Sequence, residues 1–198
     1  MIQFNNLNQS VPYSFFKKLY VKALDKGQKN IDAISISSYN SIKKEVDSRF
    51  VNLKFINNNE FIFFSNYNSP KAEAFNSYNQ ISALFFWPSI NTQIRIKAII
   101  KKTSNEFNNK YFKQRLGDKN ALAISSQQSK MISSFDLVIE KYEDTKEKQN
   151  LFECPDYWGG YSFAPYEIEF WEGNSSRINK RNLYSKNKGT WQHSILEP

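Results

Sequence analysis

The chain has 198 residues and a mass of 23.3 kDa, so a single folded domain spanning residues 1–198 is expected. With 40% hydrophobic and 16% aromatic residues it can bury a sizeable core, which excludes disorder for most of its length. The chain has 27 Lys and Arg residues and 19 Asp and Glu residues, so its net charge is +8. This charge favours anionic partners such as nucleic acid, an acidic surface or a phosphorylated small molecule.

The first half of the chain is predicted to begin with a helix and to continue with short strands. Apolar side chains recur at helical spacing over residues 12–26, and Gly27 follows as a stop signal. Three asparagines at 57–59 separate two β-rich runs and predict a hairpin turn. The strands expected in this half span residues 31–38, 48–56, 60–66, 80–87 and 92–102, with a short helix at 69–78.

The second half passes from helices back to strands. Helical patterns cover residues 104–115 and 120–129, and a charged, exposed helix is predicted over 133–148. A β-meander closes the chain, with turns at 159–160, 173–174 and 188–189. Many short strands with a few inserted helices predict a mainly β, α+β protein with a closed or split β-barrel, rather than a parallel α/β sheet.

Several classes of chemistry are disfavoured by what the sequence lacks. A lone cysteine, Cys154, and a lone histidine, His193, exclude an internal disulfide framework, cysteine-based zinc clusters and multi-histidine metal sites, so no metal is expected. A Ser-His-Asp or Cys-His arrangement would have to use His193, which lies inside a terminal strand pattern. No GxxxxGK[ST] or GxGxxG motif occurs, so side chains would have to hold any phosphorylated ligand.

Basic residues inside strand and helix patterns are candidates for that role, although for any one alone a structural role is the simpler interpretation. Arg49 and Lys54 are an odd number of residues apart, so they can reach one ligand only near a bulge or a strand end. Tyr111 and Arg115 are four residues apart on a predicted helix, where a hydroxyl and a guanidinium could grip one anion. The basic candidates are Arg49, Lys54, Lys71, Arg115, Arg177 and Arg181.

Taken together, nine segments of the chain resemble the pyridoxamine 5'-phosphate oxidases in order and spacing. The resemblance covers nearly the whole chain, and WGGY followed by IEFWEG and an arginine-rich strand is its most specific part. The segments are SRFVNLKF (48–55), FIFFSNYNSPKA (61–72), LFFW (84–87), TQIRI (92–96), YFKQR (111–115), SSQQS (125–129), WGGY (158–161), IEFWEG (168–173) and RINKR (177–181).

This resemblance implies an FMN-binding split β-barrel that acts as a homodimer, with two flavin sites formed where the subunits meet. The β-meander at about 158–198 would serve dimerisation and cover the substrate. The implied reaction oxidises pyridoxine or pyridoxamine 5'-phosphate to pyridoxal 5'-phosphate. In that family the flavin takes a hydride equivalent from the substrate C4' and O₂ reoxidises it, yielding hydrogen peroxide.

The resemblance also implies roles for individual residues. Lys54, Tyr111 and Arg115 would grip the substrate phosphate, with Lys119 beside them. Arg177 and Asn179 would cover the substrate next to the reacting carbon, as the catalytic pair. FMN would be held by Arg49, Lys54, Phe64, Ser65, Lys71, Gln93, Gln128, Ser129, Trp171 and Arg181.

Three positions depart from the family pattern. Pro70 stands where an arginine usually precedes the lysine of an SRKA-like motif, which removes one ligand of the flavin phosphate. Lys119 replaces a serine that helps to hold the substrate phosphate. Asn179 replaces a histidine that touches substrate; it can still form hydrogen bonds but cannot titrate near neutral pH. The chain ending, Ile195-Leu196-Glu197-Pro198, is altered as well.

Alternatives remain open at this point. A related FMN split-barrel oxidase with another substrate, as in phenazine biosynthesis, or a flavin-binding paralogue with little turnover would share the same motifs. A basic barrel that stacks single-stranded nucleic acid is disfavoured, because the basic residues are dispersed along the chain. Composition alone assigns Trp87, Trp158 and Trp171 to the core, and family position favours a site role only for Trp171. The N-terminus lacks a basic and apolar leader pattern and no membrane span is evident, so a cytoplasmic protein is expected.

Overall fold

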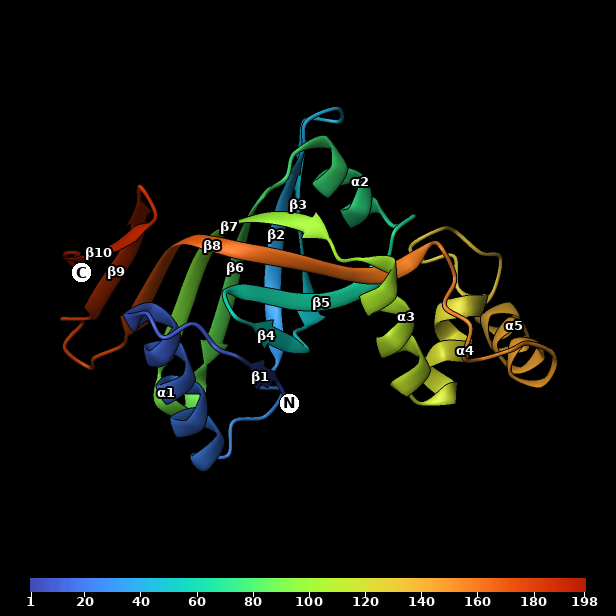
Figure 1. Cartoon of the computed structure of the whole chain (residues 1–198), viewed down its shortest axis with the longest axis horizontal. Helices are drawn as coiled ribbons and strands as arrows, with labels where there is room; N and C mark the ends of the chain where they lie inside the picture. The colour runs from blue at the N-terminus through green and yellow to red at the C-terminus, as the bar shows by residue number, and fades with distance from the viewer.

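The computed structural model describes residues 1–198 and is organised around a ten-stranded sheet (Figure 1). Its neighbouring strands follow the order β1-β4-β5-β8-β7-β6-β2-β3, while β9 pairs with β8 and β10 with β9. The strands are β1 Gln3–Asn5, β2 Ala33–Asn40, β3 Glu45–Asn52, β4 Phe55–Asn57, β5 Glu60–Asn66, β6 Gln80–Trp87, β7 Thr92–Lys102, β8 Trp158–Glu172, β9 Lys180–Asn187 and β10 Thr190–Ile195. The helices are α1 Val11–Asp25, α2 Pro70–Ser77, α3 Asn105–Gln114, α4 Gly117–Ser125 and α5 Phe135–Lys148, with a 3₁₀ turn, η1, at Pro88–Ile90.

The core confirms the alternating pattern expected for the central strands. In β7, alternate side chains from Ile94 to Ile100 are buried, which is the arrangement of a strand with one face on the core. Helix α1 packs on this face, with the Phe16 ring 5.4 Å from Phe85 and 5.6 Å from Trp87 between ring centroids. Trp87 is therefore a core residue, as its composition-based assignment predicted.

Strand β8 connects the two ends of the molecule (Figure 1). Its first residues pair with β5, where Trp158 faces Asn66, and its last residues pair with β9, where Trp171 faces Arg181. Along its length it also pairs with β7, with a register shift between Lys97 and Ala98. Residues at the two ends of β8 therefore belong to different regions of one chain, with α3, α4 and α5 near one end and the β9–β10 hairpin at the other.

The predicted strand at 48–56 is two strands. β3 ends at Asn52 and pairs with β2, whereas β4 begins at Phe55 and pairs with β5. Leu53 and Lys54 lie between them and donate backbone hydrogen bonds to Asp32 and Ile62. The chain changes partner strand here, which a continuous β-rich run of residues does not reveal.

Two other predicted boundaries are corrected. The predicted turn at Gly159 and Gly160 is wrong, because both residues lie inside β8 and pair with Ser65 and Phe64 of β5. The helix predicted over 120–129 begins at Gly117 and ends at Ser125, so the glutamine and serine residues after it lie in a loop. The hairpin turns at 57–59 and 188–189 are confirmed, with Asn58 and Lys188 at positive φ.

Candidate functional site

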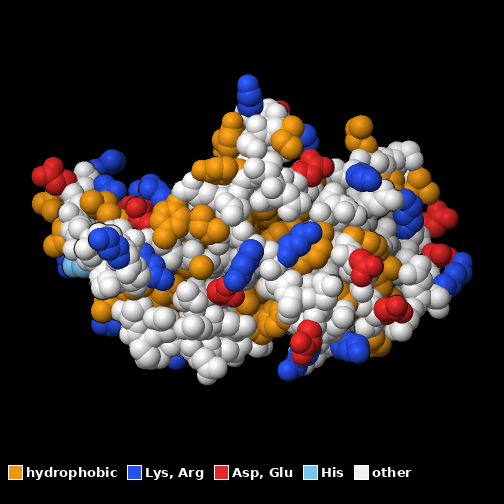
Figure 2. All heavy atoms as spheres, turned by 45° about the horizontal axis from the view of Figure 1, so that its top comes forward, with side chains coloured by type: hydrophobic (Ala, Val, Ile, Leu, Met, Phe, Trp, Pro, Cys, Tyr) orange, Lys and Arg blue, Asp and Glu red, His pale blue; other side chains and the backbone are white.

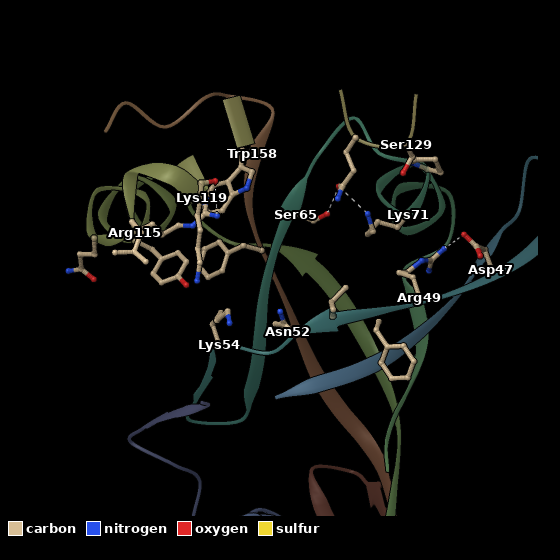
Figure 3. A pocket seen from close by; sticks show the side chains of 18 residues that line it. Asp47, Arg49, Asn52, Lys54, Ser65, Lys71, Arg115, Lys119, Ser129 and Trp158 are labelled. Carbon is tan, nitrogen blue, oxygen red and sulfur yellow. Dashed lines mark hydrogen bonds and ion pairs between the residues drawn. The ribbon is translucent and has the colours of Figure 1, made fainter. Parts of the chain in front are cut away.

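A cavity of about 880 Å³ lies between β3, β5, α2, α3 and the loop after α4 (Figure 3). Most of the residues that the sequence assigned to cofactor and substrate phosphate line it, although they come from segments far apart in the chain. Those residues are Arg49, Lys54, Phe64, Ser65, Lys71, Tyr111, Arg115, Lys119, Gln128 and Ser129. The change of strand partner after Asn52 lets Arg49 and Lys54 reach one cavity, in agreement with the strand-end requirement.

One side of the cavity is built around Lys71, near the start of α2. Its ammonium group donates to Gln128 Oε1 over 3.1 Å, and the Ser65 hydroxyl donates to the same oxygen over 3.1 Å. Lys71 is only 8% exposed and has no carboxylate partner. The pKa of Lys71 is lowered to about 8, mainly by burial and also by the nearby charge of Arg49, while Asp47 acts in the opposite direction.

Arg49 and Lys54 are both held by acidic neighbours. Arg49 donates to the Ser38 hydroxyl over 2.8 Å and forms an ion pair with Asp47. Lys54 forms an ion pair with Asp32, with 3.2 Å between its Nζ and Oδ2. Burial acts to raise the pKa of Asp32, but the Lys54 charge and hydrogen bond outweigh it and hold that pKa below its usual value.

The other side of the cavity is an aromatic wall that carries Arg115. The Phe64 ring is stacked on Tyr111 with 4.0 Å between centroids and on Trp158 with 5.1 Å. The Arg115 guanidinium lies 4.4 Å from the Trp158 ring centroid, and Nη2 donates to the Lys119 carbonyl over 3.3 Å. Its Nη1 is buried without a hydrogen-bond partner.

Arg115 does not continue the helix that contains Tyr111. It is the C-cap residue, with extended φ and ψ, so the predicted i and i+4 pair on one helix face is only partly correct. Both side chains nevertheless line the cavity. Burial lowers the pKa of Arg115, while burial raises the pKa of Tyr111 and Arg115 opposes that rise.

The cations of the cavity fall into two groups on either side of β5 (Figure 3). Arg49 and Lys71 lie on one side, and Lys54, Arg115 and Lys119 lie on the other. Asp47 is the only carboxylate residue in the lining, and Pro70 lines it where the family pattern has an arginine. Such an excess of positive charge in a partly buried cavity is suited to binding anions, and its two groups could bind two of them.

Three predicted cofactor residues lie outside this cavity. Gln93 on β7, Trp171 on β8 and Arg181 on β9 are paired in register across three adjacent strands. They form a row near the C-terminal end of β8, away from its first residue, Trp158. One chain does not bring them to the remaining predicted site residues.

The predicted catalytic pair also lies at that end of the molecule. Arg177, at φ 62°, and Asn179 occupy the connection between β8 and β9. Asn179 Oδ1 accepts a hydrogen bond of 3.0 Å from the Asn174 backbone N–H and so closes this loop. Neither residue lines the cavity that contains Lys71 and Arg115.

Three residues that contact the side chains of predicted site residues were not identified from the sequence. Glu169 on β8 is only 6% exposed and forms ion pairs with Arg181 on β9 and with Arg95 on β7. It therefore holds the side chain of Arg181 in a fixed orientation. Asp47 pairs with Arg49, and the Trp158 ring lies against the Arg115 guanidinium. Glu169 and Trp158 belong to the quoted IEFWEG and WGGY motifs, whereas no sequence signal marked Asp47.

Comparison with solved structures defines the class of fold. The chain superposes on PhzG from Burkholderia lata 383, solved with tetrahydrophenazine-1-carboxylic acid, with a TM-score of 0.90 at 22% identity, covering 96% of this chain and 93% of that one. It superposes on a pyridoxamine 5'-phosphate oxidase-related, FMN-binding protein from Nostoc punctiforme with a TM-score of 0.79 at 11% identity, covering 96% and 99% of the two chains. The fold is therefore the split β-barrel, in the α+β class, as predicted.

Sequence comparison identifies the family within this class. The chain is 35% identical to pyridoxine/pyridoxamine 5'-phosphate oxidase 1 of Hydrogenovibrio crunogenus over 195 residues, covering 96% of this chain and 89% of the relative. It is 33% identical to the oxidase of Leptospira biflexa over 190 residues, covering 94% and 89%. The chain belongs to the pyridoxine/pyridoxamine 5'-phosphate oxidase family, which confirms the resemblance found in its motifs.

The terminal β-meander matches a family model of its own. Residues 158–198 match the pyridoxine 5'-phosphate oxidase C-terminal dimerisation region, and this match supports a homodimer. The same segment contains β8, β9 and β10. None of the helices has the length and apolar character required to cross a membrane.

Proposed function

We propose that this protein is an FMN-dependent oxidase that converts pyridoxine 5'-phosphate or pyridoxamine 5'-phosphate to pyridoxal 5'-phosphate, with O₂ as electron acceptor and hydrogen peroxide as second product. The observation that carries this proposal is the arrangement of the cations in the cavity. They form two groups, which are separated by β5 and the aromatic side chains beside it. Two phosphorylated molecules, a cofactor and a substrate, require two such groups. Membership of the oxidase family supports the same assignment.

The Lys71 side of the cavity fits the phosphate and ribityl chain of FMN. A nearly buried ammonium hydrogen-bonded only to neutral acceptors leaves a charge that an anion would compensate. Arg49 adds a second cation, and Ser65, Gln128 and Ser129 offer hydroxyl and amide groups. Bound FMN would supply a ring system that accepts two electrons from substrate and returns them to O₂.

The Arg115 side fits the phosphate of the substrate. Arg115 has no carboxylate partner and one nitrogen without a hydrogen bond, so a phosphate could complete its coordination. Tyr111 adds a hydroxyl, Lys119 adds a further charge, and Lys54 adds a cation that is already paired with Asp32. Holding the phosphate would fix the distance of the pyridine ring from this wall and so orient its C4' carbon.

A second copy of the chain would complete each site. Gln93, Trp171 and Arg181 form a row at the other end of β8, and Arg177 and Asn179 lie in the loop beside it. Except for Gln93, these residues fall within the segment that matches the dimerisation region. A two-fold axis that brings this end of one chain to the cavity of the other would unite all the predicted site residues.

Two alternatives are weaker on particular observations. PhzG shares the fold and was solved with a phenazine acid, so the fold alone does not select the substrate. The unpaired Arg115 and the added Lys119 favour a phosphorylated substrate. Against nucleic acid, the face shown in Figure 2 has basic side chains scattered among acidic ones rather than gathered in a stripe. Elsewhere in the chain basic residues form ion pairs, such as Lys97 with Glu167.

The first test is made on the purified protein loaded with FMN. Its absorbance spectrum reports flavin binding, and pyridoxine 5'-phosphate is then added under air with detection of peroxide and of pyridoxal 5'-phosphate. Both products should appear together. Flavin binding without turnover of either vitamer would refute the substrate assignment and point to a divergent oxidase, and absence of flavin binding would refute the cofactor assignment.

The shared site is tested by mixing two impaired chains, assayed with pyridoxine 5'-phosphate well below the raised KM of R115A, where each variant alone should retain little activity. When R115A and R177A chains are co-expressed, a heterodimer has one site with both changes and one site with neither. Random pairing should then restore up to about a quarter of wild-type activity, because half of the dimers are mixed and each has one intact site. Activity of the mixed population no higher than that of the two variants expressed separately would contradict a site built from two subunits.

A further inference from the structure

The first residue of β8, Trp158, lies against Arg115 on the cavity wall (Figure 3). We propose that Trp158 is a positioning residue, whose ring holds the Arg115 guanidinium in the orientation that receives the substrate phosphate. This inference rests on the proposed function. Sequence composition placed Trp158 in the core, and it is indeed only 6% exposed, but it also lines the cavity beside the charged group.

Arg115 needs such a support because few other contacts orient it. It follows the last turn of α3, and its only side-chain hydrogen bond is the one from Nη2 to the Lys119 carbonyl. A free arginine side chain samples many rotamers, and fixing it costs conformational entropy at the moment of binding. The Trp158 ring at 4.4 Å and the Phe112 ring at 5.5 Å confine the guanidinium before substrate arrives.

An aromatic support suits this task better than a carboxylate would. An acidic partner would hold Arg115 firmly but would also neutralise the charge that a phosphate must find. The indole ring attracts the cation through its π face and leaves the net charge unchanged. On the other side of the cavity, by contrast, the arginine does have an acidic partner, because Arg49 is paired with the carboxylate of Asp47.

Trp158 is itself held in place by the residues that follow it. A Cβ at Gly159 would overlap the Tyr67 hydroxyl, and one at Gly160 would overlap the Thr103 hydroxyl, so the two glycines permit close packing here. The Gly160 carbonyl accepts hydrogen bonds from Tyr67 over 3.0 Å and from Thr103 over 3.1 Å. Asn108 on α3 accepts the Gly160 N–H over 2.8 Å, which ties the start of β8 to the helix that precedes Arg115.

The test uses flavin-loaded protein and a ligand that cannot be oxidised. 4-Deoxypyridoxine 5'-phosphate lacks the oxygen at C4', and unphosphorylated 4-deoxypyridoxine is its matched control. Binding of both is measured by calorimetry on wild type, W158L and W158F. The change to Leu should weaken binding of the phosphorylated ligand about tenfold, while W158F, which keeps an aromatic face, should stay within about threefold of wild type. Neither variant should alter binding of the unphosphorylated ligand.

A control variant and a double variant separate positioning from packing. Phe107 belongs to the same aromatic cluster through Phe64 and Phe55 but neither lines the cavity nor contacts Arg115, so F107L should leave both ligands unaffected. In an R115A background, W158L should cause no further loss for the phosphorylated ligand, because the group through which it acts is absent. With substrate, W158L should raise KM and leave kcat unchanged.

Three results would overturn the proposal. These are an equal loss of affinity for both ligands in W158L, a loss in W158L that is fully additive with R115A, and wild-type affinity for the phosphorylated ligand in W158L. Failure of the proposed function has a different signature: wild-type protein itself would then bind the phosphorylated ligand no more tightly than the unphosphorylated one. A comparison of thermal unfolding midpoints ensures that any weakened variant is folded.

Discussion

Replacing Arg115 with alanine should damage substrate binding far more than cofactor binding. The guanidinium is substantially buried, lacks an acidic partner and has an unpaired nitrogen, so a phosphate would gain a charge-assisted contact there. Such contacts are worth about 1.5 to 3 kcal/mol. At about 1.4 kcal/mol per factor of ten, R115A should raise KM for pyridoxine 5'-phosphate roughly 10- to 150-fold. Lys54 and Lys119 remain in the cavity and keep binding from being abolished.

The assay combines steady-state kinetics with a titration of FMN fluorescence. The FMN Kd should change by less than about twofold, since Arg49 and Lys71 lie on the other side of β5. K113A is the matched control, because Lys113 lies in the last turn of α3, two residues before Arg115, is exposed and does not line the cavity. An unchanged KM together with loss of flavin from R115A would show that Arg115 serves the cofactor and would refute the reasoning.

Other consequences of the same geometry can be measured separately. D47N removes the carboxylate paired with Arg49 and should tighten FMN binding by about three- to tenfold, as read from fluorescence titration; equal or weaker binding would contradict competition for that arginine. The protonated Lys71 amine binds an anion, and its pKa is lowered to about 8. FMN affinity should therefore fall as pH rises from about 7 through 8, a range in which the FMN phosphate, with its second pKa of about 6, stays dianionic. K71R should lose this fall, and a fall that persists in K71R must come from another group. G159A places a methyl group on the Tyr67 hydroxyl and should lower the free energy of unfolding by about 2 kcal/mol in urea; unchanged stability would show that the tyrosine moves aside.

Much of the fold could be predicted from local patterns. The alternation in β7, the spacing of apolar residues in α1 and the asparagines before β5 each report on their own neighbours in the chain. The secondary-structure predictions that were wrong concern segments whose conformation depends on pairing with a strand distant in the sequence. The run at 48–56 breaks because β3 and β4 pair with different strands, and Gly159 and Gly160 continue a strand because β5 lies beside them.

Ten of the predicted site residues line one cavity, whereas the other five lie near the other end of β8. The family resemblance implied sites shared between two subunits, and within one chain β8 does separate Arg177 and Arg181 from Arg49 and Lys71. Spacing in sequence contains no information on whether two groups meet within a chain or across subunits. The contact between Trp158 and Arg115 was likewise not predicted, since a buried tryptophan has the same sequence signature in a core and against a cation.

The sequence by itself determined the family, the types of charged and aromatic residue available for a phosphorylated ligand, and most of the helices and strands, because these depend on residue identity and on contacts within a few positions. Only the tertiary structure decided which charges remain unpaired. Arg49 is paired with Asp47, while Arg115 lies against an indole ring with no carboxylate nearby. How strongly a charged side chain binds a ligand depends on its burial and on the neighbours that folding brings to it. Both are properties of the folded structure, and the order of residues in the sequence does not show them.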